Sequence, residues 1–307
     1  MQAEKLRLLS DPPAVAFIKA RERDAASFRI VTYALDPFAP TGDRYEALNY
    51  PNLSIVRGLQ SVNGYDALRL ERLAAISGAQ TEAGVILDNT VFSPQHVGFD
   101  LLNVKYLLAE PSEAIAPQRW HKLTSFDGVD VYENLRPMPR AWLVGQVAVQ
   151  PQTEVLRTIR EGRLSDGAPF NPATTALLET EDFGGREITL PLLSTITQAE
   201  VQVTLYEPHR IELETNNPQA ALLVLSEVYY RGWNARIDGQ KASVYRANYA
   251  LRGVAVPGGK HHIEFVYRAP SLRTGAVYAG LGCLFLLTGA VIAQRRRQPR
   301  TGEPGKS

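Results

Sequence analysis

The chain has 307 residues, of which 45% are hydrophobic and 21% charged, and its formal net charge is +1. A charge this close to neutral gives no bulk electrostatic reason to bind nucleic acid, and the apolar content is sufficient for folded domains with cores of their own. The single cysteine, Cys283, excludes an intrachain disulfide and a zinc site built from cysteines.

Residues 12–150 alternate helix-like and strand-like segments, which predicts a mixed α/β domain. Helical spacing predicts helices in PAVAFIKARE and in YDALRLERLAAIS, where Gly78 supplies a C-terminal stop. Asp127-Gly128 separates two β-rich segments and predicts a hairpin. The segments with the composition of strands are FRIVTYAL, LSIVRGLQ, KYLLAE, WHKLTSF and VDVYENL.

Residues 151–196 are expected to form a connector, with a short helix in TEVLRTIREG followed by a loop. Residues 197–269 contain seven short segments of strand composition, separated by turn signals such as Asp238-Gly239. Strands at this spacing favour a β-sandwich.

Residues 274–293 carry no charge over about 20 positions, and a helix of that length spans one hydrocarbon core of ~30 Å. A buried core helix is the alternative, but soluble helices of this length normally carry charge on one face. The predicted fold class is therefore α+β: a mixed α/β N-terminal domain, an all-β sandwich-like C-terminal domain and one C-terminal transmembrane helix.

The flanks of this helix predict its orientation. The basic tail at residues 294–307 contains Arg295, Arg296, Arg297 and Arg300, whereas only Arg273 precedes the helix closely. The positive-inside rule therefore predicts a cytoplasmic C-terminus and an extracytoplasmic location for the bulk of the chain, with the helix in a bacterial cell membrane.

The residues after Met1 lack the apolar region of a signal peptide, so export needs another explanation. Either the chain continues upstream into further membrane helices, or it is tail-anchored with its domains in the cytoplasm. The first is favoured, because the second would push the arginine-rich tail across the membrane. A stripe of small residues in the helix, Gly275, Ala279, Gly282 and Gly289, also suits close packing against upstream helices of the same protein.

Several segments occur in an order typical of a known family. They are GLQSVNGYDALRLERL, LLNVKYLLAE, MPRAWLVG and the long run LLVLSEVYYRGWNARIDGQKASVYRANYALRGVAVPGGKHHIEFVYRAP. With the membrane helix that follows, this pattern resembles the C-terminal end of the bacterial YfhO-like membrane proteins. One departure is Arg231, where that family tends to have proline.

The resemblance implies a multi-pass protein with a GT-C-like membrane core that uses polyprenyl-phosphate sugars to modify surface polymers. The catalytic carboxylate of such enzymes would lie in an early loop of that core, so no catalytic residue is carried over to this chain. Histidines at metal-ligand spacing, a Walker loop and GxGxxG and GxSxG motifs are absent from the sequence, and we expect no metal and no cofactor.

The first candidate site is a group of aromatic and polar residues that could stack on sugar rings and hydrogen-bond their hydroxyls. The alternative is structural, with Trp233 in the sandwich core and Asp238 in a hairpin turn. Period-2 alternation places Trp233 on one face with Ala235 and Ile237. The glycan-contact candidates are Tyr229, Tyr230, Trp233, Asp238, Tyr245 and Asn248, with Tyr249 beside them.

The second candidate is the loop containing Asn63, Tyr65 and Asp66, which could face the membrane core. The structural alternative is that Asp66 caps the helix that follows.

Two functions stay open. The chain is either the non-catalytic outer domain of a polyprenyl-phosphate-sugar-dependent glycosyltransferase acting on cell-surface polysaccharide, or a membrane-tethered binding or scaffolding module without enzymatic activity. The expected partners are the lipid bilayer, the upstream transmembrane helices of the parent protein, and a surface glycan or polyprenyl-linked sugar.

Overall fold

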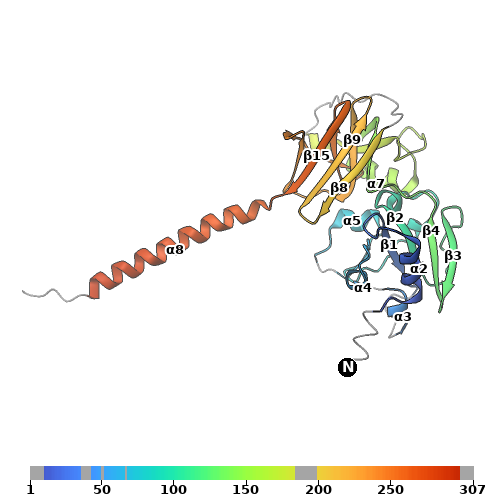
Figure 1. The fold of residues 1–307 in the computed structure, drawn as a ribbon, viewed down its shortest axis with the longest axis horizontal. Helices are drawn as coiled ribbons and strands as arrows, with labels where there is room; N and C mark the ends of the chain where they lie inside the picture. Colours follow the sequence, from blue (N-terminus) through green and yellow to red (C-terminus); the bar gives the residue numbers. More distant parts are fainter. Residues whose placement is uncertain (1–9, 36–42, 50–51, 66–67, 184–198, 298–307) are drawn as a thin grey trace, which may run out of the picture.

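The computed structural model describes residues 10–35, 43–49, 52–65, 68–183 and 199–297. A mixed α/β body forms one end of the molecule and a β-sandwich forms the other, and a long helix, α8, projects from the sandwich (Figure 1). The predicted α+β class with one C-terminal apolar helix is confirmed.

The helices before α8 are short, and the 28-residue α8 is by far the longest. The α-helices are α2 (Pro13–Arg21), α3 (Asp43–Ala47), α4 (Leu53–Val56), α5 (Glu71–Ile76), α6 (Gly98–Leu101), α7 (Gln152–Glu161) and α8 (Pro270–Arg297), with 3-10 turns at η1 (Asn89–Phe92) and η2 (Thr180–Phe183).

The strands form three sheets. The strands are β1 (Arg29–Tyr33), β2 (Val104–Ala109), β3 (Trp120–Phe126), β4 (Val129–Asn134), β5 (Ala141–Val144), β6 (Gln146–Gln150), β7 (Thr175–Glu179), β8 (Glu200–Glu207), β9 (Arg210–Asn217), β10 (Ala221–Val228), β11 (Trp233–Ile237), β12 (Gln240–Ala242), β13 (Tyr245–Ala247), β14 (Leu251–Val256) and β15 (Gly259–Tyr267).

The α/β body is built on a four-stranded sheet in the order β1-β2-β4-β3. The β1–β2 pair is parallel and the other pairs are antiparallel. Successive residues of β2 bury their side chains on opposite faces, because a strand alternates with a period of two. Tyr106 and Leu108 pack in the core beneath α2, whereas Leu107 packs in a second core that continues to the sandwich.

The sandwich packs a six-stranded sheet, β5-β10-β14-β13-β7-β6, against a five-stranded sheet, β12-β11-β15-β9-β8. Their shared core includes Leu223 of β10 and Phe265 of β15. On β10 the neighbouring residues Leu222 and Val224 face the other way and join the core that reaches the α/β body. Both faces of β10 are therefore covered, which explains its continuous apolar sequence.

Both predicted Asp-Gly hairpins are confirmed. Asp127 and Gly128 have φ values of 48° and 81°, and Asp238 and Gly239 have 49° and 80°. Two successive residues with positive φ make the type I′ turn, whose twist matches that of paired strands.

Two local predictions were wrong. The segment LSIVRGLQ, expected as a strand, forms the helical turn α4 instead, with Ile55 and Val56 exposed. Instead of pairing with a full strand, β1 forms an isolated parallel bridge on this side, from Ile30 to Ser61. The helix expected across YDALRLERLAAIS begins only at Glu71.

The sheets do not follow the three units expected from the sequence, which are the α/β domain at 12–150, the connector at 151–196 and the sandwich-like domain at 197–269. Strands β5, β6 and β7 lie in the same sheet as β10, β13 and β14. The six-stranded sheet therefore takes strands from all three ranges. The reason is pairing at long range, because β5 pairs with β10 and β7 with β13, and local pattern does not encode such partners.

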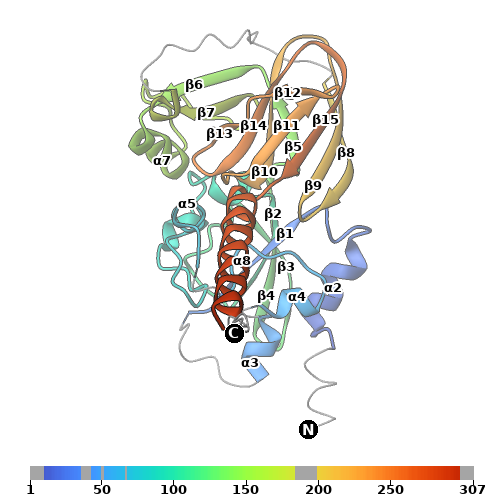
Figure 2. The same cartoon turned by 90° about the vertical axis from the view of Figure 1, so that its left-hand side faces the viewer.

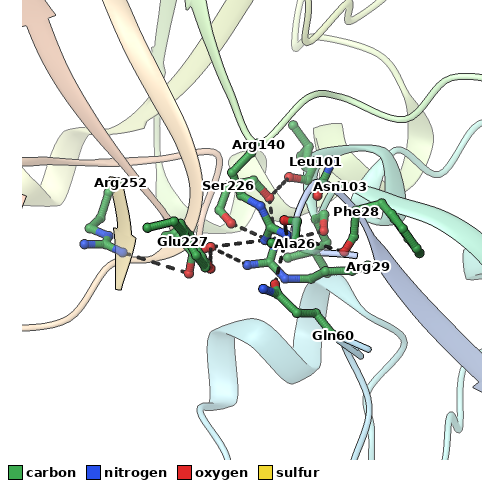
Figure 3. Close-up of polar contacts among 12 residues, drawn as sticks. Ala26, Phe28, Arg29, Gln60, Leu101, Asn103, Arg140, Ser226, Glu227 and Arg252 are labelled. Atoms are coloured by element: carbon green, nitrogen blue, oxygen red, sulfur yellow. Dashed lines mark hydrogen bonds and ion pairs between the residues drawn. The ribbon is translucent and has the colours of Figure 1, made fainter. Parts of the chain in front are cut away.

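A carboxylate that is largely, though not fully, buried joins the α/β body to the sandwich (Figure 3). Glu227, near the end of β10, accepts hydrogen bonds at Oε1 from Arg29 at 2.5 Å, Arg140 at 3.2 Å and the Tyr206 hydroxyl at 2.6 Å. Arg252 lies 4.0 Å from its Oε2 atom. Burial lowers the pKa of Arg252 to about 10, so its guanidinium stays charged at neutral pH.

The arginines that hold Glu227 also donate to backbone carbonyls on both sides of the junction between the α/β body and the sandwich. Arg29 donates to the carbonyl of Ser226 at 2.8 Å, and the Ser226 hydroxyl donates to the carbonyl of Leu101 at 2.8 Å. Arg140 donates to the carbonyl of Ala26 at 2.6 Å. These bonds cross between β10, the start of β1 and the loop before β5, so they fix the two bodies against each other.

We predict that Glu227→Gln destabilises the fold by about 3–5 kcal/mol, because it leaves several buried guanidinium groups without their counter-charge. Burial raises the pKa of Glu227, but the charges of Arg29 and Arg140 and the Tyr206 hydroxyl outweigh it, so the pKa lies below its ordinary value. The stabilisation is therefore present above the ordinary glutamate pKa and is lost as the pH falls through the folded-state pKa.

Chemical unfolding of the full chain in detergent, at neutral and at acid pH, measures both effects. Glu214→Gln is the matched control, because Glu214 is exposed on β9 and a surface change alters stability by only about 0.5 kcal/mol. Equal losses in the two variants would contradict the role assigned to Glu227.

Candidate functional site

The six glycan-contact candidates do not converge on one site. The structure distributes them among the start of β11, the segment between β10 and β11, a buried loop after β13, and one end of the sandwich.

Trp233 lies at the start of β11 and is half-buried. Its indole packs against the sandwich core together with Ile237, and Ala235 is buried in that core, as the alternation predicts. The guanidinium of Arg252 lies 3.7 Å from the ring centroid, and Tyr267 packs at 5.4 Å between centroids. One face of the indole is therefore covered by a cation, which leaves less room for a sugar ring on that side.

Tyr229 and Tyr230 lie in the segment between β10 and β11. The Tyr229 amide donates to the carbonyl of Ala250 at 2.7 Å, and the Arg246 guanidinium lies 5.0 Å from the centre of its ring. Tyr230 is 52% exposed. The same segment contacts the membrane-helix junction, since the Arg268 amide donates to the carbonyl of Gly232 at 2.8 Å.

Asn248 and Tyr249 form a strained turn with φ values of 49° and 72°. Asn248 is fully buried, and its backbone N–H donates to the carbonyl of Leu177 at 2.8 Å. Its Oδ1 atom accepts from the Leu177 amide, also at 2.8 Å. The Asn248 side chain thus accepts the hydrogen bond that a neighbouring strand would otherwise accept from the Leu177 amide in β7. Asparagine also tolerates the left-handed conformation that the turn requires.

Asp238 and Tyr245 line a pocket of about 380 Å³ at one end of the sandwich, together with His261. Asp238 Oδ2 lies 2.7 Å from His261 Nδ1, and Asp238 Oδ1 accepts from the His262 amide at 3.0 Å. The His261 contact and the amide bond lower the pKa of Asp238. Polar side chains complete the wall at Gln240, Lys241 and Ser243.

His261 is the pocket residue that the candidate set missed. In β15, His261 shares a face with Ile263 and Phe265, both of which are buried in the sandwich core. A histidine at the end of an inward-facing row was therefore a signal available in the sequence. A carboxylate, an imidazole and a phenol around one pocket are groups that hydrogen-bond hydroxyls of a small polar ligand.

The second candidate loop is anchored by Asn63. Its Oδ1 atom accepts from the Thr32 amide at 3.0 Å, and its Nδ2 atom donates to the Thr32 carbonyl at 2.8 Å and to Gly84 at 3.3 Å. Asn63 is buried and uses both ends of its amide to hold the loop against β1. This arrangement is structural, since the side chain has its partners within the protein.

Tyr65 is held from the other side by Asn52, which exchanges two hydrogen bonds of 2.9 Å with its backbone. The Tyr65 side chain is 59% exposed. A Cβ atom on Gly64 would lie 2.4 Å from Asn52 Oδ1, so a larger residue here would displace the Asn52 side chain that holds Tyr65. Asp66 lies outside the described residues.

This loop borders a groove of about 670 Å³ between α4 and α5. Polar and apolar residues both line it, and the polar ones include Arg69 and the buried Gln80. The apolar lining consists of Ile55, Leu59, Val62, Tyr65, Leu68, Leu70, Leu73 and Ala74.

In the part of the chain that the structure describes, no group of three histidine, cysteine, aspartate or glutamate side chains could hold a metal ion. The segment Thr274–Gln294 of α8 has a mean hydropathy of 2.1 and is not buried within the protein, as expected for a helix that could cross a membrane.

Replacement of Trp233 by alanine should reduce the free energy of unfolding. The loss should lie at the low end of the roughly 3–5 kcal/mol typical of a truncated core aromatic, because the indole is half-buried. Thermal melting of the full chain in detergent measures the loss. Tyr230→Ala is the matched control and should leave the melt nearly unchanged, since that ring is exposed. An unchanged melt for the Trp233 variant would instead favour an exposed sugar platform.

Comparison with known proteins matches residues 191–278 to the family model described as bacterial membrane protein YfhO. The uncharacterized protein YfhO of Bacillus subtilis strain 168 is 30% identical over 77 residues. That match covers 25% of this chain and 8% of the relative, which is therefore about three times as long. No solved structure matches the chain. The C-terminal part of this chain, from the matched β strands to the first part of α8, is therefore similar to the bacterial membrane protein YfhO family.

Proposed function

We propose that the chain is the extracytoplasmic C-terminal region of a polytopic YfhO-like protein, and that it serves as a non-catalytic outer domain of a GT-C-like glycosyltransferase. Such an enzyme would take sugars from polyprenyl-phosphate donors and modify cell-surface polysaccharide. The observation that carries the proposal is the joint between β15 and α8, because the residues matched to the family model, 191–278, include it.

The joint supports a location directly at the membrane surface. β15 ends at Tyr267 and α8 begins at Pro270. The Arg268 amide is also bonded to the carbonyl of Gly232, which ties the link to the sandwich. A link this short keeps the sandwich within a few residues of the candidate span at Thr274–Gln294.

The charge on either side of the span supports the proposed orientation. Three arginines at the end of α8, Arg295–Arg297, follow the apolar segment. A cytoplasmic position for these residues places the α/β body and the sandwich outside the cytoplasm. That is the side on which polyprenyl-linked sugars would meet surface polymers.

The state of the carboxylates supports a non-catalytic role for the described residues. A general base needs a free carboxylate near its substrate, whereas each buried carboxylate of the described part is paired with a basic side chain. The pairs are Asp100–Arg119, Glu110–Arg44, Asp130–Lys122 and Glu179 with Arg72 and Arg246.

The alternative, a membrane-tethered binding module, is favoured by the pocket containing Asp238, His261 and Tyr245. This pocket could hold a sugar of a surface glycan without any transfer chemistry. Both hypotheses keep the glycan as a partner and differ in whether an attached membrane core performs catalysis.

When the upstream membrane helices are supplied, a reporter fused after Ser307 should lie in the cytoplasm. A reporter inserted in the loop at 111–117 should lie outside it. The physical reason is the arginine bias across the span. Paired reporters of opposite compartment preference, tested in cells, provide the measurement. The reverse pattern would overturn the proposed orientation.

The purified 307-residue chain should transfer no sugar from a radiolabelled polyprenyl-phosphate donor, whereas the parent protein with its membrane core should. Turnover by the chain alone would reveal a catalytic group within it. If the parent protein binds the surface glycan without transfer, and Tyr245→Phe weakens that binding, the binding-module alternative replaces the glycosyltransferase proposal.

A further inference from the structure

The α/β body exposes a group of apolar side chains within a short stretch of sequence. The exposed fractions are 76% for Ile55, 57% for Val56, 59% for Tyr65, 87% for Leu68 and 38% for Leu70. Single exposed apolar residues are common on soluble proteins. Four of these side chains, Ile55, Tyr65, Leu68 and Leu70, line one groove of about 670 Å³, and an exposed apolar surface of this kind normally has an apolar partner.

The polarity of α4 is inverted relative to that of a helix on a water-facing surface. Ser54 is buried and accepts a hydrogen bond from Asn49 Nδ2 at 2.8 Å. Arg57, directly after the helix, is buried and donates to Asn49 Oδ1 at 2.8 Å. The intervening Ile55 and Val56 face outward. A water-facing helix buries its apolar side chains and exposes its polar ones, so this segment is built for apolar surroundings.

The position of α8 identifies those surroundings. α8 leaves the molecule on the side that carries α4 and α5, and a view from that side shows these helices on either side of α8 (Figure 2). A bilayer crossed by Thr274–Gln294 therefore faces α4 and α5, and Leu68 lines the groove beside these helices. The interfacial layer outside the ~30 Å hydrocarbon core is about 5–8 Å thick on each side and accepts tyrosine and aliphatic side chains.

We propose that the surface formed by Ile55, Val56, Tyr65, Leu68 and Leu70 docks into the interfacial layer of the bilayer that α8 spans. The occupant of the groove is then the acyl and headgroup region of the lipid, and Arg69, which lines the groove, would pair with anionic headgroups. This contact gives the outer domain a second attachment and fixes its tilt on the membrane. The inference rests on the membrane placement of α8 in the proposed function.

The test uses an environment-sensitive fluorophore on single cysteines of the full chain in vesicles of phosphatidylcholine and phosphatidylglycerol. The native Cys283 labels the span. With Cys283→Ser as background, Ile55→Cys and Leu68→Cys label the surface, and His121→Cys labels an exposed position of β3 on the far side from α8 (Figure 1). Lipids with a nitroxide in the headgroup or along the acyl chain report depth.

The expected result is blue-shifted emission at positions 55 and 68, quenched by nitroxides near the headgroup, with water-like emission and little quenching at 121. Water-like emission at 55 and 68 while Cys283 is quenched within the acyl region would overturn the inference alone. Water-like emission at Cys283 would overturn the membrane placement itself. Blue-shifted emission at 55 and 68 without lipid quenching would show that protein covers the surface and would also overturn the proposal.

A second variant tests the contact without a label. Ile55→Asp and Leu68→Asp change only exposed side chains, so the melt of the chain in detergent should be unchanged. In vesicles, the same variants should increase proteolysis of the α/β body, because the domain is no longer held against the lipid. Unchanged proteolysis in vesicles would contradict the docking.

Discussion

The pairing of Glu227 with arginines from separate segments of the chain is the interaction on which the arrangement of the molecule depends. A carboxylate that is only 17% exposed must be compensated, or its burial costs more than the fold can supply. Arg29 comes from β1, Arg140 from the entry to β5 and Arg252 from β14. Satisfying Glu227 therefore requires the α/β body and the sandwich to meet in one relative position.

β10 carries this constraint because it is buried on both faces. Its odd-numbered residues pack into the sandwich and its even-numbered residues pack toward the α/β body, and Glu227 lies near its end. β10 pairs with β14, and β15 across the sandwich leads directly into α8. The direction in which α8 leaves the body is thereby linked to the charge network. The same network also determines which face of the α/β body lies on the side of α8.

Local signals in the sequence were sufficient for the elements that depend on local chemistry. The Asp-Gly hairpins, helix α7, the alternating strands around Ile263 and the apolar span of α8 follow from turn propensity and periodicity. Sheet membership was not predictable in this way, because the pairings of β5 with β10 and of β7 with β13 join residues more than 60 positions apart. The same distinction applies to the candidate site. The inward face of Trp233 could be predicted from alternation. The contact of His261 with Asp238 and the four-way pairing of Glu227 could not, because they depend on tertiary structure.

The failure at LSIVRGLQ has a physical cause that local propensity does not contain. Four apolar or small residues in a row suggest a strand packed on a core, because the prediction assumes that water surrounds the protein. In the structure the polar Ser54 is inside and Ile55 is outside. If lipid rather than water faces this surface, the transfer free energy of an exposed aliphatic side chain changes sign in favour of exposure, and the inverted turn becomes the stable arrangement. The same residues then satisfy the hydrophobic effect through the bilayer instead of through a sheet.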